Sequence, residues 1–454
     1  MRRATVCVVG GGLTGLAAAY RAASRYGVPT VLLEAGDRVG GLLRSELVGN
    51  YLFDAGGSHI IFSKSEERLR SLLHHLRTVG WFVHRRVTRI YLRGSFVKYP
   101  FEVGLADLPP RTRVRVLKGI IAAAGERSEP RNFLEWIYAV FGEGMAEEYL
   151  IPYNRKLWKT PLEEITLEWV GGRVPNPPLD DIIRAAVGET VEAYTHQLVF
   201  MYPKRGGIEA LARGIAADAE NAGAEIRTSR PVEKVRPLGS ILSVEYYGGE
   251  IECERVIYTA PLTAAPRIIE GLSSESRTLL SRLRSVPLAV VGIGARVRPP
   301  FIHWVYFPGE ETVFHRLAVL SRYSAHNAPR GRASFIAEVS FRSVGELRSA
   351  DDDTIIRKVI EGMESIGLIK ASDVETASVW RWEHAYPIYD AARSEALKRA
   401  IPELKKLGII PAGRFGAWEY LNMDAVYSRG VEAADEALVH VDRQSADEGR
   451  YTPY

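Results

Sequence analysis

Three glycines near the N-terminus constrain the fold of this chain more than any other feature. Gly10, Gly12 and Gly15 have the spacing Gly-x-Gly-x-x-Gly. They follow the apolar run 4–10 and precede a stretch rich in small residues over 13–27. A strand, such a turn and a helix in this order are typical of the first half of a βαβ unit. The pattern predicts an α/β layer whose first turn binds the pyrophosphate of a dinucleotide.

An acidic residue and the start of the helix complete the predicted dinucleotide site. We expect the second strand at 29–34, and Glu34 ends it where an acid would contact the ribose hydroxyls. An acid at this position disfavours a 2′-phosphate. Leu13 and Thr14 open the helix, so their N–H groups would face the phosphates. An ordinary glycine turn is the alternative, and it explains neither the acid nor the helix.

Composition is that of an ordinary soluble enzyme. The 454 residues are too many for one core, so two or three domains are expected. Lys and Arg (59) exceed Asp and Glu (55) by only four, which does not indicate a nucleic-acid partner. Cys7 and Cys253 lie in apolar runs and are interpreted as reduced core thiols, which predicts a cytoplasmic protein. No apolar run reaches the length of a membrane span.

The sequence predicts no metal site and no competing catalytic motif. The patterns His-Glu-x-x-His, Cys-x-x-Cys and Gly-x-Ser-x-Gly are absent. His74 and His75 are the only adjacent histidines. They fall on an expected helix, where neighbouring side chains would not face one ligand site.

The periodicity along the chain predicts three regions, one of them discontinuous. Alternating apolar and basic residues over 81–101 indicate a hairpin that turns at Arg93-Gly94-Ser95. Strand and helix patterns near both ends and in the middle indicate one nucleotide-binding layer, which the other regions interrupt. The expected limits are 1–80, 200–280 and 387–454 for the nucleotide-binding domain, 81–104 and 281–386 for an antiparallel-sheet domain, and 105–199 for a helical domain.

Two further motifs resemble the FAD contacts of one enzyme superfamily. Residues 34–41 read E-A-G-D-R-V-G-G, and residues 413–416 read G-R-F-G shortly before a helix. Both resemble motifs of the superfamily that contains amine oxidases, protoporphyrinogen oxidases and UDP-galactopyranose mutases. The resemblance implies FAD as cofactor and places along it Ala35, Arg38, Gly41, Val232, Arg414, Asn422, Met423 and Asp424.

The same resemblance implies the fold class. The expected fold is α/β, with a discontinuous Rossmann-like FAD-binding domain of the glutathione-reductase type. An antiparallel β-sheet substrate domain and a helical insertion complete it.

Segments in the middle of the chain resemble the mutase branch of this superfamily, in its eukaryotic-type pattern. Residues 53–63 resemble the loop that lies against the flavin, with Gly57, Ser58 and His59 beside the cofactor. Residues 304–316 contain the motifs W-x-Y-F-P and F-x-R. By resemblance, Arg173 and Arg316 grip the substrate diphosphate, and further contacts to the nucleotide sugar come from Tyr99, Phe101, Glu102, Asn154, Trp158, Trp304, Tyr306, Tyr386 and Tyr420.

Three departures from the mutase pattern concern the site. Glu102 stands where the eukaryotic pattern has a glutamine near the uracil. A carboxylate there can accept from the uracil N–H, but it repels a nearby phosphate. Ser58 is an insertion in the flavin loop, and the cluster 422–424 is shorter than the eukaryotic form and closer to the bacterial one. These departures leave the identity of the sugar nucleotide open.

The resemblance to mutases implies a flavin-dependent intramolecular transferase. N5 of reduced FAD would act as the nucleophile on the anomeric carbon, so that pyranose and furanose forms interconvert without net redox change. His59 would shape the surroundings of N5. The implied partners are a nucleotide sugar of the UDP-galactose class and an electron donor such as NAD(P)H. A homo-oligomer is compatible with the sequence.

Two other functions are compatible with the sequence. An FAD-dependent oxidoreductase resembling the amine or protoporphyrinogen oxidases would need an apolar or aromatic pocket, whereas Arg173 and Arg316 favour an anion. A flavin-binding protein with a structural role would not need these arginines. Without the resemblance, each arginine could form a surface ion pair and each tyrosine could belong to a core.

Overall fold

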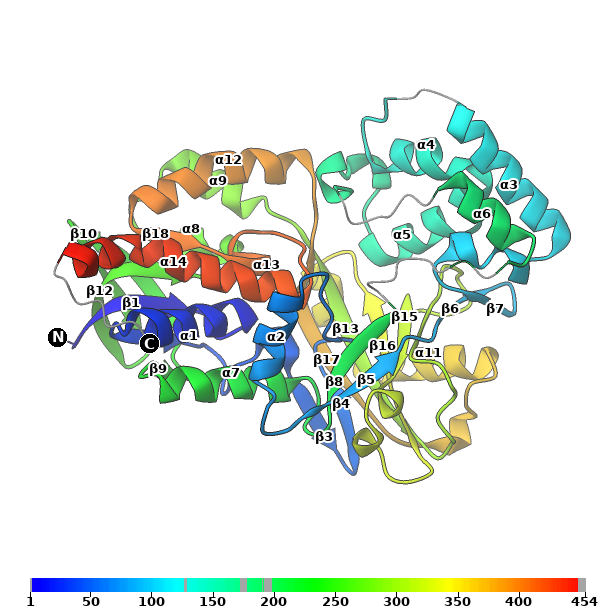
Figure 1. The fold of residues 1–454 in the computed structure, drawn as a ribbon, viewed down its shortest axis with the longest axis horizontal. Coiled ribbons are helices and arrows are strands. Elements are labelled where there is room, and N and C mark those ends of the chain that lie inside the picture. The colour runs from blue at the N-terminus through cyan, green and yellow to red at the C-terminus, as the bar shows by residue number, and fades with distance from the viewer. Residues whose placement is uncertain (1, 126–128, 172–177, 190, 192–197, 448–454) are drawn as a thin grey trace.

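Three regions of secondary structure make up the chain, and their arrangement positions the site. The computed structural model describes residues 2–125, 129–171, 178–189, 191 and 198–447. Figure 1 shows a sheet that contains the first described strand and is covered by helices, among them the last described helix. A second sheet lies beside it, and a group of helices lies next to the second sheet.

The first sheet has seven strands in the order β10-β11-β12-β1-β2-β9, with β18 also paired to β12. The pairs that involve β1, β2, β9 and β18 are parallel, whereas β10 and β11 form an antiparallel extension. The strands are β1 (Arg2–Val9), β2 (Thr30–Leu33), β9 (Glu225–Arg227), β10 (Val232–Leu238), β11 (Ile241–Tyr246), β12 (Gly249–Tyr258) and β18 (Ile409–Pro411).

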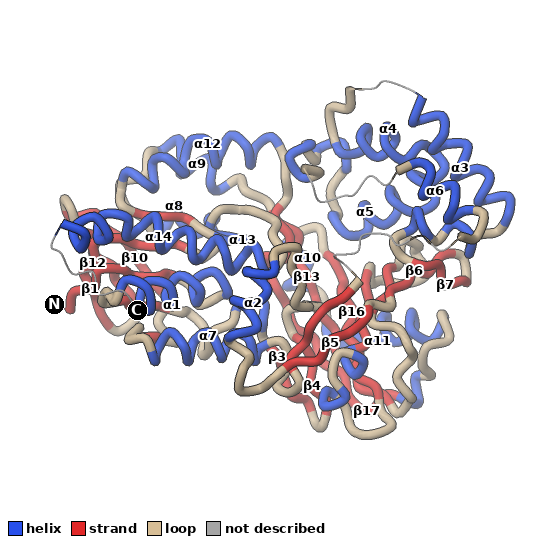
Figure 2. The backbone as a smooth tube through the Cα atoms, in the orientation of Figure 1, coloured by secondary structure: helices blue, strands red, loops and turns tan. Residues whose placement is uncertain are grey.

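Helices cover both faces of this sheet because buried side chains alternate along its strands. On β1, Val6 and Val8 share a core with one set of helices, whereas Cys7 and Val9 share a core with another. Figure 2 shows both helix layers. The first set is α1 (Leu13–Tyr26), α7 (Glu209–Asn221) and α14 (Met423–Asp447), and the second is α8 (Ala265–Ile268), α9 (Ser274–Ser281) and α12 (Ala391–Lys406).

The predicted βαβ unit is present, with ends within two residues of those expected. Both cysteines are buried and free, as expected. The sequence pattern did not separate helix α12, which begins after Asp390 and contains Pro402. The side chain of Asp390 accepts a hydrogen bond from the Arg393 N–H, which is the capping signal that marks the start of this helix.

The second sheet is mainly antiparallel, in the order β17-β13-β16-β15-β14-β6-β7. Helices α10 (Val344–Ser349) and α11 (Asp352–Ser365) pack on one face through a separate core. The other face turns toward the first sheet, and its side chains belong to the core of α1 and α14. The strands are β6 (Thr88–Leu92), β7 (Ser95–Lys98), β13 (Ser285–Ala295), β14 (Trp304–Tyr306), β15 (Arg316–Val319), β16 (Ala333–Ser340) and β17 (Val374–Pro387).

Two further sheets have two strands each, β5 with β8 and β3 with β4. The predicted hairpin at Arg93-Gly94-Ser95 joins β6 to β7. However, β5 (Trp81–Arg85) does not extend that hairpin and pairs with β8 (Val199–Pro203). A second hairpin joins β3 (Ser45–Val48) to β4 (Tyr51–Asp54), and helix α2 (Glu66–His74) follows it.

The helical region contains α3 (Pro110–Gly125), α4 (Phe133–Met145), α5 (Ile151–Trp158) and α6 (Leu179–Ala186), with a π-helical turn at Ala146–Leu150. A Cβ at Gly142, which has a φ of 66°, would lie 2.1 Å from the carbonyl oxygen of Gly119. Glycine therefore lets α3 and α4 touch. These features agree with the predicted α/β fold class. Among the described helices, none has the length and apolar character that a membrane crossing requires.

Candidate functional site

The turn between β1 and α1 has the geometry of a phosphate cradle. Gly10 has a φ of 104°, and a Cβ at Gly15 would lie 1.9 Å from the Gly10 carbonyl oxygen. Both positions therefore require glycine. Gly12 is the N-cap of α1 and has no side-chain cap. Apart from its chain neighbours, no described atom lies within 4 Å of a Cβ at Gly12, so the space beside the start of the helix is open.

The acid and the second motif lie against this turn. Glu34 follows β2, and its carboxylate accepts hydrogen bonds from the N–H groups of Gly11 (2.6 Å) and Gly36 (2.7 Å). The Gly40 N–H donates to the Gly11 carbonyl at 2.8 Å, and a Cβ at Gly41 would lie 3.3 Å from the Gly12 Cα. The motif therefore closes over the glycine turn, which is the surrounding that the ADP half of FAD needs.

The other residues predicted along this part of the cofactor differ in burial and in their partners. Leu13 and Thr14 are buried, and the Thr14 hydroxyl donates to the Val426 carbonyl at 3.3 Å. Ala35 is exposed. Arg38 forms ion pairs with Glu46 and Glu209. Val232 begins β10 and packs against the second core of the first sheet.

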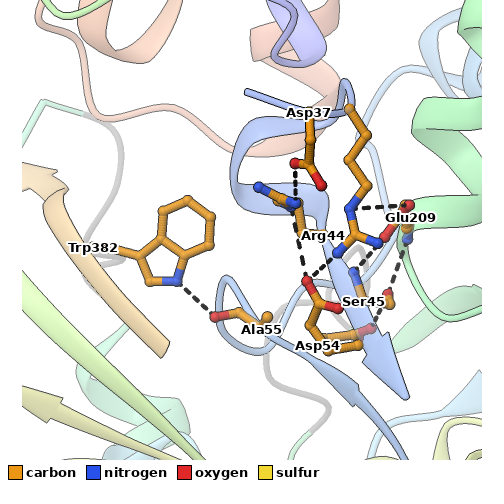
Figure 3. Close-up of polar contacts among 9 residues, drawn as sticks. Asp37, Arg44, Ser45, Asp54, Ala55, Glu209 and Trp382 are labelled. Atoms are coloured by element: carbon orange, nitrogen blue, oxygen red, sulfur yellow. Dashed lines mark hydrogen bonds and ion pairs between the residues drawn. The ribbon is translucent and has the colours of Figure 1, made fainter. Parts of the chain in front are cut away.

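A buried polar network anchors the base of the predicted flavin loop, and Figure 3 shows the part of it that contains Ser45, Asp54 and Trp382. Asp54 ends β4 and accepts hydrogen bonds from the Ser45 hydroxyl (2.8 Å), the Tyr202 hydroxyl (2.8 Å) and the Ile208 N–H (3.1 Å). Burial raises the pKa of Asp54 to about 6. Trp382 on β17 donates its indole N–H to the Ala55 carbonyl at 2.6 Å. The backbone that enters the Gly56–Ser58 loop is thus fixed from two sides.

A cavity of about 700 Å³ lies where the three regions meet. Its walls come from the flavin loop, from the inner face of the second sheet, from the helical region and from the segment before α14. It collects most of the residues predicted for the flavin ring and the substrate: Ser58, His59, Tyr99, Phe101, Glu102, Asn154, Trp304, Tyr306, Arg316, Tyr386, Arg414, Tyr420, Asn422, Met423 and Asp424.

Two residues predicted to contact the substrate, Trp158 and Arg173, are not among the described residues that line the cavity. Trp158 is 1% exposed and lies behind Asn154, to whose side-chain oxygen its indole N–H donates at 3.2 Å. Its position follows from helical spacing, since residues four apart share a face. Trp158 therefore orients Asn154 from behind. Arg173 lies outside the described residues.

His59 is held as a neutral imidazole. Its Nδ1 lies 3.0 Å from the Gly57 carbonyl oxygen. Burial lowers the pKa of His59 to about 4, and the nearby positive charges of Arg414 and Arg316 act in the same direction. A neutral ring beside the flavin loop can donate or accept a hydrogen bond at neutral pH without adding charge.

Arg414 and Asp424 order the C-terminal wall. The Arg414 guanidinium donates to the carbonyls of Leu421 (2.6 Å) and Ala385 (3.3 Å) and lies 5.1 Å from the ring centre of Tyr420. The Ser63 hydroxyl donates to the Asp424 carboxylate at 2.7 Å, which ties the flavin loop to the start of α14. The Arg414 guanidinium thus lies fixed beside the place where the flavin ring would lie.

Aromatic rings line the opposite part of the cavity. The ring centres of Tyr99 and Tyr306 are 5.0 Å apart, and those of Phe101 and Tyr149 are 5.1 Å apart in a stacked arrangement. Burial raises the pKa of Tyr99, so it stays a neutral phenol. Rings of this kind suit a flat ligand group that packs against them.

The sequence did not reveal Glu338, which is central to the site. It lies on β16 directly opposite Arg316 on β15, and the two side chains form an ion pair. Glu338 is 1% exposed, and the Arg316 guanidinium holds its pKa well below the usual range against the opposing effect of burial. A sequence signal existed: Glu338 is the one charged residue in the strand Ala333–Ser340.

The two adjacent histidines differ from expectation. His74 ends α2 and His75 follows it, and both rings approach the Asp218 carboxylate. The expectation that they could not face one point was wrong because the helix ends between them. However, His75 already binds Asp218 through Nδ1 (2.6 Å) and the Tyr427 hydroxyl through Nε2 (2.9 Å). The cluster is a structural network that joins α2, α7 and α14.

Known proteins resemble this chain over nearly its whole length. Coproporphyrinogen III oxidase from Bacillus subtilis (strain 168) is 20% identical over 470 residues, which cover 96% of this chain and 98% of that protein. The crystal structure of a reduced UDP-galactopyranose mutase superposes with a TM-score of 0.88 at 28% identity and covers 98% of both chains. A putrescine oxidase superposes with a TM-score of 0.69 at 17% identity over 96% of this chain and 99% of the other.

The family description that matches is flavin containing amine oxidoreductase, over residues 13–438. This match spans both FAD motifs and the cavity between them. The cofactor is therefore FAD, and the glycine turn, Glu34 and the Arg414 wall have the donors and the room that it needs. The chain belongs to the flavin containing amine oxidoreductase family and is a flavin-dependent enzyme.

Proposed function

We propose that this enzyme interconverts the pyranose and furanose forms of a nucleotide sugar of the UDP-galactose class. The observation that carries the proposal is the position of Arg316, a guanidinium in the same cavity as the flavin loop and the aromatic wall. An oxidase of amines needs no anion site there. The 28% identity to a UDP-galactopyranose mutase over 98% of the chain also favours this function.

In this proposal the protein binds and orients the substrate. FAD, when bound in its reduced form, would supply a nucleophile for the anomeric carbon. Arg316 would bind the diphosphate and stabilise its charge as the bond to the sugar breaks. Arg173 is proposed as a second arginine for the same group. Neutral His59 would keep the surroundings of N5 free of added positive charge.

The substrate residues divide between the two ends of the cavity. Phe101 and Tyr149 stack on each other, and both line the part of the cavity where a nucleobase would bind. Glu102 in this part would accept from a base N–H. Toward the flavin, the side chains of Asn154, Tyr306, Tyr386 and Tyr420 would hydrogen-bond the sugar and its phosphate.

The sequence relatives favour a second candidate function. The curated relatives matched over most of the chain are coproporphyrinogen III oxidases, at 20–21% identity. An aromatic cavity beside a flavin could also hold a porphyrinogen, which would be oxidised with net transfer of electrons. In that case Arg316 would bind a substrate carboxylate.

The two candidates are separated by product analysis. We would incubate the FAD-loaded enzyme with UDP-galactofuranose, oxidised or reduced with dithionite, and separate the products by chromatography. The mutase proposal predicts conversion to UDP-galactopyranose with reduced enzyme alone and without oxygen consumption. Absence of conversion in both states, with oxygen consumption on coproporphyrinogen III, would support the oxidase.

Two accompanying proposals concern the surroundings of the enzyme. The sequence contains one Gly-x-Gly-x-x-Gly unit, so we propose that NAD(P)H reduces the flavin by entering the cavity. Free buried thiols at Cys7 and Cys253 support a reducing, cytoplasmic location. Anaerobic mixing with NADH or NADPH, followed by the loss of flavin absorbance, tests the first of these.

A further inference from the structure

Glu338 occupies an unusual place for a charged residue. It lies in the middle of the second sheet, on a strand that pairs with β13 on one side and β15 on the other. The side chain is 1% exposed, and a buried carboxylate is costly unless donors surround it. Its face of the sheet is the one that turns toward the cavity, since Ile336 on the same face belongs to the core there.

Three residues donate hydrogen bonds to this carboxylate, and His315 lies near it. Oε1 accepts from the Arg316 guanidinium through Nε (2.9 Å) and Nη2, and from the Ser58 N–H at 2.9 Å. Oε2 accepts from the Tyr386 hydroxyl at 3.0 Å and lies 3.4 Å from His315 Nε2. The donors come from the flavin loop, from β15 and from β17. One side chain thus joins three walls of the cavity.

The geometry also determines which edge of Arg316 faces the ligand space. Its Nε and Nη2 atoms are bound to Glu338, whereas Nη1 has no protein partner in the described part of the chain. The Arg316 side chain is 22% exposed beside a carboxylate that is 1% exposed. The bound edge is therefore buried, and the other edge faces the cavity. A guanidinium fixed in this way loses little further freedom when it binds an anion.

The same carboxylate restrains the flavin loop. Ser58 donates its N–H to Glu338 and its hydroxyl lies 2.7 Å from the Tyr323 hydroxyl. A Cβ at Gly57 would lie 3.1 Å from Glu338 Oε1, so the loop backbone rests on the carboxylate. Ser58, the residue inserted relative to the usual loop, is therefore the point at which the loop is attached to the sheet.

We propose that Glu338 is a positioning residue that presents the Nη1 edge of Arg316 to an anionic ligand and fixes the Gly57–Ser58 backbone beside it. The inference rests on the proposed function only in taking the ligand anion to be a diphosphate. Glu338 itself does not line the cavity, so it acts through Arg316 and the loop backbone. Its removal should weaken anion binding through Arg316, and it should have no such effect when Arg316 is absent.

A double-mutant cycle tests this dependence. We would measure binding of inorganic pyrophosphate to the FAD-loaded protein by calorimetry for wild type, Glu338→Ala, Arg316→Ala and the double variant. Glu338→Ala should raise the Kd at least about tenfold, which reflects the loss of an oriented charge-assisted donor. In the Arg316→Ala background the same change should alter the Kd less than about twofold.

Two further variants sharpen the cycle. Glu338→Gln keeps an acceptor oxygen for Arg316 and Ser58, so its Kd should lie between those of wild type and Glu338→Ala. Glu375→Gln is the matched control, because Glu375 pairs with Arg332 and Tyr51 in the same sheet but does not line the cavity. Its Kd should equal that of wild type. Should Glu338→Ala fail to fold, Glu338→Leu, which conserves volume, takes its place with the same expectation.

Three results of the binding measurements would overturn the proposal. Wild-type affinity in Glu338→Ala overturns the proposal, and so does an effect of equal size with and without Arg316, which would mean that Glu338 acts on the fold in general. Absence of pyrophosphate binding to wild type also overturns it, because Arg316 would then present nothing to an anion. Failure of the mutase assay with an intact cycle would refute the proposed function alone.

Discussion

The two halves of the site are built in different ways. The phosphate cradle lies within residues 10–41, a single βαβ unit and the motif after it, and its groups are backbone N–H groups and glycines. The proposed anion site around Arg316 draws on the flavin loop, β15, β16 and β17, which are distant in sequence. A site made of backbone is encoded locally, whereas a site made of side chains depends on the whole fold.

Because of this difference, we expect the two halves of the site to respond differently to substitutions. In the cradle, the absence of side chains is the functional feature, so adding one atom should be enough to abolish binding. Around Arg316, the Glu338 carboxylate has several donors, so removal of one donor leaves the others in place but weakens the compensation of a buried charge. The following changes are ordered from the largest expected effect to the smallest.

Two glycines separate folding from cofactor binding in the cradle. Gly15→Ala would place a Cβ against the Gly10 carbonyl and should destabilise the protein by at least about 3 kcal/mol. Gly12→Ala meets no atom within 4 Å in the described chain and has a φ of −72°, which any residue adopts. It should fold normally yet lose FAD, because the Cβ would occupy the pyrophosphate space.

Circular dichroism and the flavin absorbance of the purified variants check this pair. A Gly12→Ala protein that keeps stoichiometric FAD would contradict the placement of the pyrophosphate at this turn. A Gly15→Ala protein as stable as wild type would contradict the close approach of α1 to β1.

Arg316→Ala tests the side-chain half of the site. Its kcat/KM should fall by about 10²–10³, equivalent to roughly 2–4 kcal/mol of lost transition-state stabilisation. It also leaves Glu338 buried without its counter-charge, which should cost about 3–5 kcal/mol of stability. The double variant with Glu338→Ala should recover part of that stability and none of the activity. Steady-state kinetics and denaturant unfolding measure the two effects separately.

Asp54 gives the network under the flavin loop a pH dependence. Its pKa is about 6 in the folded state against an ordinary 3.8, so the folded state holds a proton that the unfolded state has lost between these values. Its contribution is present below about pH 4 and is lost as the pH rises to 6, by up to roughly 3 kcal/mol. Asp54→Asn should remove this part of the dependence. Unfolding at pH 4, 5 and 6 compares the two proteins, and parallel curves would contradict the assignment.

The smallest expected effect concerns the second attachment of the same loop. Trp382→Phe removes the indole donor to the Ala55 carbonyl and should cost about 1 kcal/mol of stability. Trp380→Phe is the control. Trp380 lies on the same strand as Trp382, but its ring packs against Phe53. Denaturant midpoints compare the two. Equal losses would mean that the hydrogen bond contributes nothing beyond ring packing.

The comparison of the two halves also shows how far the sequence could predict this molecule. The βαβ unit, the hairpin at Arg93–Ser95 and the fold class follow from local periodicity and glycine spacing. The pairing of β5 with β8 did not, because strand partners distant in sequence leave no local pattern. The sequence pattern also did not predict helix α12, although Asp390 is a capping residue at its start.

The same limit applies to the candidate site. Resemblance placed Arg316, Tyr306 and Tyr386 in one pocket, and the structure brings them to one cavity. It gave no reason to single out Glu338, whose role exists only because β15 and β16 lie in register. Trp158 was expected at the ligand, but the turn of α5 places it behind Asn154. Partners of a side chain become visible only when the fold is known.

The central claim is that one cavity holds both the flavin ring and a diphosphate bound to Arg316. A crystal structure of the reduced, FAD-loaded enzyme with UDP tests it most directly. We expect the flavin ring to lie beside Gly57–His59 and Arg414. The diphosphate oxygens should lie within hydrogen-bond distance of Arg316 Nη1, while Glu338 stays bound to Arg316 Nε. A diphosphate bound elsewhere, with Arg316 turned away from it, would contradict the account.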